Sequence, residues 1–226
     1  MYVYGRNVIK DYKNLKKIYV QDSLKNSELV KNINVPIKYL NKRELDKMVS
    51  GNHQGIVGEV EDYKYFELND LDNDVIVILD HLEDPHNLGA IIRTCEAAGF
   101  DNIIIPKNRS VSINGTVVKT SVGTIERVKI AQVTNLNNAI QTLKKKGYWI
   151  IGTDMIGTDY KELDYNGKVA IVIGNEGVGI SRLVKENCDF IATIPMNGQV
   201  NSLNASVAAG VLLFEILRQR RWFFEL

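Results

Sequence analysis

From residue 75 onward, the chain alternates between short apolar runs and longer stretches with helical periodicity. The short runs are apolar at successive positions, as in Val75–Leu79 and Val169–Ile173. Strands of this kind are buried on both faces, which is typical of parallel sheets covered by helices. We therefore predict an α/β fold with a mostly parallel sheet. The predicted strands are Val75–Leu79, Ile103–Ile105, Trp149–Gly152, Val169–Ile173 and Phe190–Ile194, and the predicted helices are Leu88–Ala98, Leu136–Lys146, Ile180–Glu186 and Ser202–Arg218.

Charge is distributed unevenly along the chain. Residues 1–58 carry 11 Lys/Arg and 5 Asp/Glu, whereas residues 59–74 carry 1 and 7. This asymmetry predicts a small basic α/β domain at 1–60, an acidic linker at 61–74 and a larger domain at 75–226. A basic domain either faces a polyanion or carries a solvated lysine-rich surface, and charge alone favours neither. Within it we expect strands at 17–20, 36–40 and 55–60 and helices at 23–32 and 42–49.

Several classes of protein are excluded by the composition. With 226 residues and 45% hydrophobic content the chain can bury a core, and no apolar run approaches the ~20 residues of a membrane span. The start of the chain lacks a signal-peptide pattern, so we expect a cytoplasmic protein. Cys95 and Cys188 are far apart, and His53, His81 and His86 form no metal-binding pattern. We expect reduced cysteines and no metal.

Two segments combine glycines with polar residues directly after predicted strands: Ile171–Gly179 and Ile194–Asn204. Glycines let the backbone approach a ligand closely, and ligands of parallel sheets lie beyond the carboxyl ends of the strands. A cofactor pocket is therefore predicted there. A Rossmann site would need its glycines after the first strand, where Asp80–Gly89 stands instead, and Gly174–Gly179 is followed by no Gly-Lys-Ser/Thr of a Walker loop.

Three segments resemble, in order, the three motifs of the SpoU (TrmH-type) methyltransferases of the SPOUT superfamily: Asn87–Gly99, Gly174–Gly177, and Ile194–Met196 with Ser202–Gly210. The resemblance spans about Ile76 to Arg220. In addition, Tyr4–Val8 and His53–Val57 resemble the ribosomal-protein-like substrate-binding domain of the RlmB-type branch, which methylates a guanosine ribose in large-subunit ribosomal RNA.

The resemblance implies a 2′-O-ribose methyltransferase that uses S-adenosylmethionine, with a C-terminal trefoil knot (the alpha/beta knot of the SPOUT fold) and a homodimer that has its active site at the interface. The last predicted helix carries apolar residues on more than one face and is followed by Trp222, Phe223 and Phe224, which agrees with a dimer. The implied cofactor contacts are Thr153, Gly174, Asn175, Gly177, Ile194, Met196 and Leu203, and the implied catalytic residues are Asn87, Arg93, Glu176, Ser202 and Asn204.

Physical chemistry limits what these catalytic residues do. A guanidinium stays protonated, so we expect Arg93 to clamp an RNA phosphate and the nucleophilic oxygen rather than to act as the base. Glu176 could instead satisfy backbone N–H groups at a helix start, and Asn87, Ser202 and Asn204 could be helix caps. Asn87 could cap the helix that follows the first strand and touch the substrate as well, and Ser202 could cap the last helix while also serving the site.

For RNA contact we name Arg6, Lys42, Arg43, His53 and Gln54, with surface solubility as the alternative. Ribosomal RNA is the first candidate target because of the two N-terminal matches, and transfer RNA is the second. Two other classes remain open: a non-catalytic RNA-binding relative, and a different adenine-nucleotide enzyme that uses the same glycine-rich loops. The joint presence of Arg93, Glu176, Ser202 and Asn204 argues against the former, and the absence of Walker and Rossmann patterns argues against the latter.

Overall fold

The computed structural model describes residues 1–31, 33–175 and 177–221. The chain divides into two compact units. The N-terminal unit comprises Met1–Lys64 and Ser112–Glu126, and the C-terminal unit comprises Tyr65–Val111 and Arg127–Leu226. The expected acidic linker at 61–74 is thus divided between the two units, and one later segment joins the N-terminal unit.

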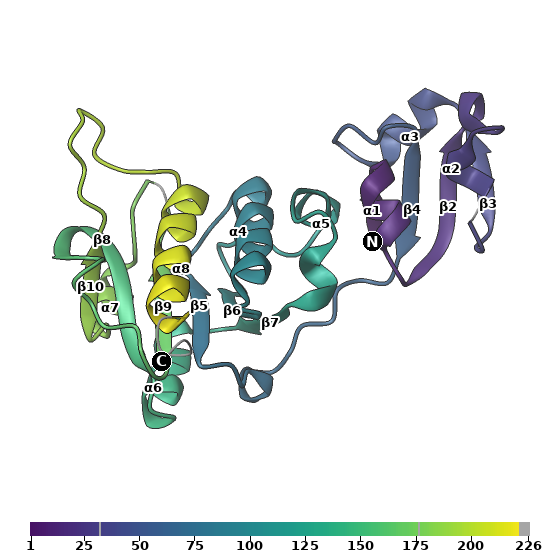
Figure 1. Ribbon diagram of the computed structural model, residues 1–226. Coiled ribbons are helices and arrows are strands. Elements are labelled where there is room, and N and C mark those ends of the chain that lie inside the picture. Colours follow the sequence, from purple (N-terminus) through teal and green to yellow (C-terminus); the bar gives the residue numbers. More distant parts are fainter. Residues whose placement is uncertain (32, 176, 222–226) are drawn as a thin grey trace. The chain divides into compact units, whose positions relative to one another are not determined.

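The C-terminal unit is built on a six-stranded sheet with the order β10-β8-β9-β5-β6-β7, in which every neighbouring pair is parallel (Figure 1). The predicted parallel α/β fold is confirmed, whereas the trefoil knot stays a prediction. Strand β7 was not predicted, because Lys129 and Gln132 interrupt its apolar run. The strands are β5 (Val75–Leu79), β6 (Asn102–Pro106), β7 (Lys129–Val133), β8 (Trp149–Asp159), β9 (Val169–Ile173) and β10 (Phe190–Thr193), and the helices are α4 (Pro85–Ala98), α6 (Leu136–Lys145), α7 (Arg182–Glu186) and α8 (Ala205–Arg221).

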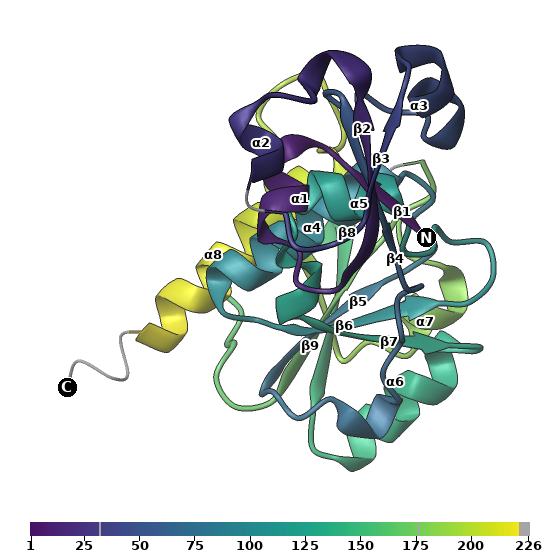
Figure 2. The same cartoon turned by 90° about the vertical axis from the view of Figure 1, so that its right-hand side faces the viewer.

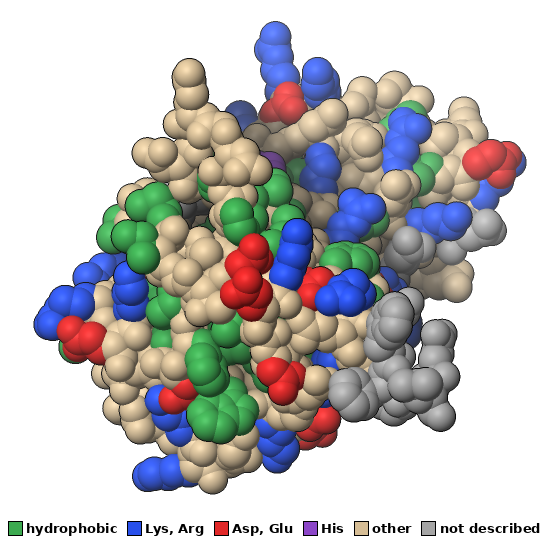
Figure 3. All heavy atoms as spheres, turned by 60° about the vertical axis from the view of Figure 1, so that its left-hand side comes forward, with side chains coloured by type: hydrophobic (Ala, Val, Ile, Leu, Met, Phe, Trp, Pro, Cys, Tyr) green, Lys and Arg blue, Asp and Glu red, His purple; other side chains and the backbone are tan. Residues whose placement is uncertain are grey.

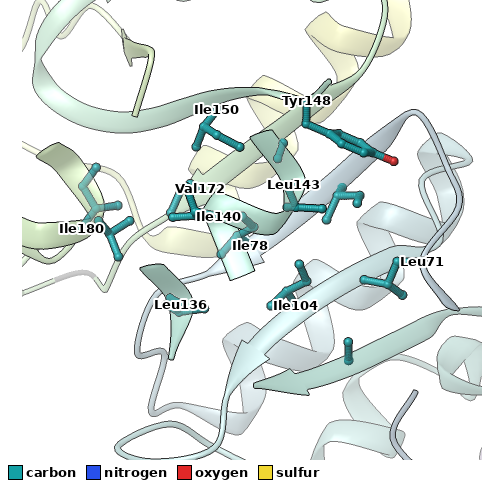
Figure 4. Packing of buried hydrophobic residues seen from close by; sticks show 14 residues of the cluster. Leu71, Ile78, Ile104, Leu136, Ile140, Leu143, Tyr148, Ile150, Val172 and Ile180 are labelled. Atoms are coloured by element: carbon teal, nitrogen blue, oxygen red, sulfur yellow. The ribbon is translucent and has the colours of Figure 1, made fainter. Parts of the chain in front are cut away.

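Helices cover both faces of this sheet, α4 and α8 on one side and α6 and α7 on the other (Figure 2). Successive side chains of a strand point to opposite faces, so each fully apolar strand supplies both cores. Ile76 and Ile78 of β5 pack with Ile140 and Leu143 of α6 in one buried cluster (Figure 4). This burial on two sides explains why β5 and β9 are apolar at every position.

Helix α4 begins differently from the expectation. Its N-cap is Asp84, whose carboxylate accepts a hydrogen bond from His86 N at 2.8 Å, and Pro85 occupies the first helical position. Asn87 is therefore the third residue of the helix rather than its cap, because the preceding Asp-Pro pair already supplies the start signal. The helix ends at Gly99, which has a left-handed φ of 79°.

The N-terminal unit contains a four-stranded sheet with the order β1-β4-β2-β3, in which only β2 and β3 pair in parallel among the described strands. The helix expected at 23–32 is wrong, because this segment forms a 3-10 turn at Asp22–Leu24 and a single short helix. The elements are β1 (Tyr2–Tyr4), α1 (Arg6–Asp11), β2 (Leu15–Gln21), α2 (Glu28–Lys31), β3 (Ile37–Leu40), α3 (Lys42–Met48), β4 (Ile56–Val60) and α5 (Gly115–Thr120). None of the helices within the described ranges is both long and apolar enough to cross a membrane.

Candidate functional site

A cavity of about 320 Å³ lies in the C-terminal unit, at the ends of β9 and β10 where their chains leave the sheet. Its walls come from three chain segments and from the first turns of α8: Thr153–Met155, Ile173–Gly179 except the undescribed residue 176, and Ile194–Leu203 in part. Parallel strands all end at the same edge, so loops that are distant in sequence converge there. The cavity occupies the position that the sequence predicts for a ligand.

Strand β8 supplies one wall of the cavity at the point where its pairing with β10 is interrupted. Ile191 and Ala192 are adjacent in β10, yet they pair with Gly152 and Thr158 of β8. The intervening residues of β8 bulge away from the ladder and include the part that lines the cavity. Two hydroxyls fix this excursion: Thr153 Oγ1 donates to the Val172 carbonyl at 3.0 Å, and Thr193 Oγ1 donates to the Met155 carbonyl at 3.0 Å.

The loop after β9 folds back on its own start. Asn175 N donates to the Gly179 carbonyl at 3.1 Å, and Gly179 N donates to the Asn175 carbonyl at 2.8 Å. Gly177 N donates to Asn175 Oδ1 at 2.9 Å. At Gly174 a Cβ atom would lie 2.2 Å from the Gly179 carbonyl carbon, so this approach of two backbone segments requires glycine.

A buried carboxylate that the sequence analysis did not single out anchors this loop. Asp80 directly follows β5, is 1% exposed, and accepts a hydrogen bond from Ser181 N at 2.6 Å. Its other oxygen pairs with His81 Nδ1. The His81 carbonyl accepts a hydrogen bond from Asn175 Nδ2 at 3.1 Å. The signal was available, since a charged residue at the end of an apolar strand lies at the ligand-binding edge.

All seven residues named for cofactor contact line this cavity, and so does Ser202. They are Thr153, Gly174, Asn175, Gly177, Ile194, Met196 and Leu203. The structure thus brings together residues that are up to 50 positions apart, while their contacts with a cofactor stay a prediction. Asp154, Met155, Ala208 and Leu212 also line the cavity and were not predicted from the sequence, whereas Val178 and Asn201 belong to the two glycine-rich segments that were.

Asp154 adds an ion-paired carboxylate to the cavity wall. Burial acts to raise the pKa of this carboxyl group, but the hydrogen bond from Lys185 and two backbone N–H groups hold the pKa below its ordinary value. Lys185 Nζ lies 2.7 Å from Asp154 Oδ2. Met155 and Val178 are 66% and 84% exposed, so apolar side chains surround the mouth of the cavity. Figure 3 shows hydrophobic side chains gathered on this face, which carries β8 and β10.

Two of the expected catalytic residues contact each other. Asn204 Nδ2 donates to Asn87 Oδ1 at 3.0 Å, which connects the first turns of α4 and α8. Asn204 Oδ1 accepts hydrogen bonds from Ser206 N at 3.0 Å and Val207 N at 3.4 Å. Of the two possible caps of the last helix, Asn204 is therefore the one that acts, because the helix begins at Ala205, three residues later than predicted.

The remaining catalytic candidates differ in their surroundings. Arg93 is exposed on α4, and within the described ranges its guanidinium forms no hydrogen bond or ion pair with another residue. Asn87, Arg93 and Asn204 do not line the cavity itself. Glu176 lies outside the described residues, as do the three aromatic residues of the expected dimer contact, Trp222, Phe223 and Phe224.

The candidates for RNA contact in the N-terminal unit also differ. His53 is 4% exposed; its Nε2 lies 3.0 Å from Asp46 Oδ1, and its Nδ1 accepts a hydrogen bond from Gly55 N at 2.9 Å. Both ring nitrogens are engaged, so His53 holds the loop before β4 together, and its contact with RNA stays a prediction. Arg6 remains exposed beside Gln54, whose Oε1 accepts a hydrogen bond from Arg6 N at 3.0 Å.

Lys42 and Arg43 are exposed in the first turn of α3. Within the described part of the chain, no cluster of His, Cys, Asp and Glu side chains is suited to a metal ion. Both cysteines are reduced, and burial raises the pKa of each thiol, that of Cys188 to about 12.

Comparison with known proteins identifies both units. The model of the SpoU rRNA Methylase family matches residues 74–214, and the model for RNA 2′-O ribose methyltransferase substrate binding matches residues 2–66. The chain is thus an RNA methyltransferase with a separate substrate-binding domain. It belongs to the SpoU family, as the three motifs indicated.

Two of the relatives match nearly the whole chain, and a third matches two thirds of it. A TrmH family tRNA/rRNA methyltransferase of Bacillus subtilis, YacO, is 44% identical over 97% of this chain and 96% of its own length. The crystal structure of an AdoMet-bound rRNA methyltransferase from Sinorhizobium meliloti matches with a TM-score of 0.78 and 26% identity, over 96% of this chain and 86% of that one. A TrmH/SpoU tRNA modifying enzyme from A. aeolicus matches with a TM-score of 0.62 and 33% identity, over 67% of this chain and 77% of its own.

Proposed function

We propose that this protein methylates the 2′-hydroxyl of a guanosine in large-subunit ribosomal RNA, with S-adenosylmethionine as the methyl donor. The observation that carries the proposal is the cavity at the carboxyl ends of β9 and β10, because all seven residues expected to contact the cofactor line it. The Sinorhizobium relative, which matches both units, was crystallised with AdoMet.

The cavity suits such a cofactor chemically. Ile194, Met196 and Leu203 offer apolar surface to an aromatic base, and the loop from Gly174 to Gly179 offers backbone polar groups. The ionised Asp154 is suited to hydroxyl or ammonium groups. When bound, S-adenosylmethionine supplies a methyl group on a positively charged sulfur. The chain itself has to orient the ribose hydroxyl toward that methyl group and assist the loss of its proton. Orientation of the reacting groups contributes ~7 to 11 kcal/mol.

Arg93 is assigned to the RNA. Its guanidinium presents a planar fork of donors that matches phosphate oxygens, and it is exposed on α4 without an acidic partner in the described residues. We propose that it holds the phosphate and the nucleophilic oxygen, while a phosphate oxygen or water accepts the proton. Asn87 and Asn204, bonded to each other at 3.0 Å, hold the first turns of α4 and α8 in place beside it.

Two observations support ribosomal over transfer RNA. The substrate-binding domain at residues 2–66 adds a second unit to the methyltransferase domain. The rRNA methyltransferase from Sinorhizobium matches 96% of this chain, whereas the tRNA modifying enzyme from A. aeolicus matches 67%. Transfer RNA is the second candidate, because that tRNA enzyme has the higher identity of the two, 33% against 26%.

We also propose a homodimer. Val207 and Phe214 are both 51% exposed and lie seven residues apart, so they share one face of α8. An exposed apolar stripe of this kind fits a second subunit. In a dimer, Arg93 is available to the partner's cavity, which agrees with its absence from the cavity of its own chain. Sedimentation analysis is expected to give twice the monomer mass, and a monomer at micromolar concentration contradicts this proposal. The cytoplasmic location stays a prediction.

The decisive experiment transfers labelled methyl groups from S-adenosylmethionine to total RNA from a strain that lacks this protein. Arg93→Ala tests the site, and Arg182→Ala is the matched control. Arg182 is also an exposed arginine, and among the described residues its ion-pair partner is Glu186, four residues further along the same helix. We expect label in large-subunit ribosomal RNA, recovered as an alkali-resistant dinucleotide, lost in Arg93→Ala and retained in Arg182→Ala.

Label in the small-RNA fraction moves the target to transfer RNA. Label that is not alkali-resistant contradicts 2′-O-methylation. If no RNA is labelled and calorimetry detects no S-adenosylmethionine binding, the catalytic proposal fails and an RNA-binding relative of the same fold remains.

A further inference from the structure

A second hollow, of about 460 Å³, lies within the N-terminal unit between α1, β2 and α2, away from the residues expected to bind RNA except Arg6. Its volume is in the range of pockets that hold small ligands, about 300 to 1,000 Å³. Leu29, Ile33 and Val35 form part of its wall and are only partly buried. The hollow exists where the expected helix at 23–32 is replaced by a turn and the short α2.

The rim of this hollow is positively charged. Arg6 and Lys10 are four residues apart on α1 and share one face, and Lys13 follows the helix. All three side chains are exposed, and none of them forms an ion pair with a described residue. Glu28 is the single carboxylate among the lining residues, and it pairs with Lys31. The rim therefore attracts anions.

The lining also carries an aromatic ring and two amides. Tyr12 is partly buried at the wall, with Asn7 and Asn34 exposed beside the hollow. Burial, reinforced by the nearby Glu126 carboxylate, raises the pKa of Tyr12, so its hydroxyl stays protonated and is able to donate. Aromatic rings stack on unpaired bases, and amides bond to base edges.

Apolar walls, one aromatic ring, two amides and a cationic rim match the parts of a single nucleotide, a flat base and a phosphate. We propose that this hollow binds one unstacked nucleotide of the RNA substrate and thereby anchors the RNA on the N-terminal unit, apart from the nucleotide that is methylated. The proposal rests on the RNA substrate argued above and adds a defined binding site to it. An acidic peptide would use the rim but would leave the ring and the amides without a partner.

The first test measures binding of the full-length protein to in-vitro transcribed large-subunit ribosomal RNA, and separately to transfer RNA, over a range of salt concentrations. The test variant is Lys10→Ala/Lys13→Ala. The matched control is Lys38→Ala/Lys47→Ala, which removes two exposed lysines from the same unit. Each contact with a phosphate of single-stranded RNA contributes about 0.7 to the slope of log Kd against log salt. We expect the slope to fall by about 1.4 in the test variant alone, with Kd raised about tenfold at physiological salt.

The second test uses transcripts that contain 4-thiouridine. Irradiation is expected to cross-link RNA to the peptides that contain Tyr12 or Leu29–Val35, and Tyr12→Leu is expected to raise Kd about tenfold, in line with the loss of one stacked base. Unchanged salt slopes in the lysine variant, or cross-links confined to other peptides, overturn the proposal. Thermal melting identifies any variant that fails to fold, and the cross-link map of the wild-type protein needs no variant.

These readouts separate the two proposals. If the wild-type protein binds RNA through this hollow but transfers no methyl group, the proposed reaction fails and the binding site stands. If methylation proceeds and the hollow variants bind RNA like the control, the binding site fails and the reaction stands.

Discussion

Replacement of Gly174 by alanine tests whether the cavity depends on the close approach of two backbone segments. The new Cβ would lie 2.2 Å from the Gly179 carbonyl carbon and 2.4 Å from Ile180 N. Ordinary contact begins at 3.4 Å, so the loop backbone has to move by about 1.2 Å. Neither obstacle is the end of a flexible side chain, which leaves backbone displacement as the main way to relieve the contact.

The expected cost follows from this displacement. Overpacking of a tight site costs about 1 to 3 kcal/mol of unfolding free energy, which for a chain of this size lowers Tm by about 2 to 12 °C. The same displacement moves a wall of the cavity, and a shift of about 1 Å at a binding site lowers activity by about 100-fold. We therefore expect Gly174→Ala to weaken S-adenosylmethionine binding at least tenfold in calorimetry.

Gly198→Ala provides the matched control. Gly198 lies in another loop, the one that follows β10, and a Cβ there would meet no atom within 4 Å. It is expected to melt within about 2 °C of the wild type, because a surface substitution away from packed features changes the unfolding free energy by less than ~0.5 kcal/mol. If Gly174→Ala melts and binds like Gly198→Ala, the close approach does not shape the cavity and the reasoning is refuted.

Asp80→Asn removes the charge that holds Ser181 N and His81, so KM for S-adenosylmethionine should rise at least fivefold in methyl-transfer assays while KM for RNA stays unchanged; equal changes in both contradict the assigned role. Asn204→Ala removes the cap of α8 and the hydrogen bond to Asn87, so urea denaturation should show that the free energy of unfolding falls by about 1 to 3 kcal/mol. A fall below ~0.5 kcal/mol contradicts these two roles of Asn204. Arg93→Lys should lower kcat without a change in the apparent pKa of the pH-rate profile, and a shifted apparent pKa would implicate the guanidinium as the base. Burial raises the pKa of Cys188 from 9.0 to about 12, so the contribution of the neutral thiol to the free energy of unfolding is complete below about pH 9 and is lost as the pH rises toward 12. Denaturation midpoints of the wild type should therefore fall over this range relative to those of Cys188→Ala, and midpoints that rise contradict a buried thiol.

The parallel sheet and the position of the cavity follow from local sequence. Strands such as Val75–Leu79 are apolar on both faces because helices cover both faces, and this pattern needs no knowledge of distant residues. Parallel strands then bring the loops after β9 and β10 to one edge. The predicted cofactor residues could therefore be grouped from sequence once the strands were placed.

Other features depend on distant partners and could not be predicted. Asn87 and Asn204 are 117 residues apart, and each resembles an ordinary helix cap when its own segment is considered alone. The structure shows that Asn204 caps α8, since its side chain accepts a hydrogen bond from Ser206 N, whereas Asp84 rather than Asn87 caps α4. The bulge of β8 likewise arises from the register against β10, which no pattern within β8 specifies. His53 was expected at the surface, but its contacts with Asp46 and Gly55 bury it.

Two walls of the cavity are held in place by hydrogen bonds within the chain. Thr153 and Thr193 fix the bulge of β8, and Asp80 fixes the loop after β9. A site that is ordered in advance loses little conformational entropy on binding. Arg93, by contrast, is exposed, and its guanidinium forms no hydrogen bond or ion pair with another described residue. Its position therefore has to be set by the RNA or by a second subunit. Cofactor binding is therefore expected to be independent of RNA, whereas the side chain of Arg93 is expected to take a fixed position only when RNA or a second subunit is bound.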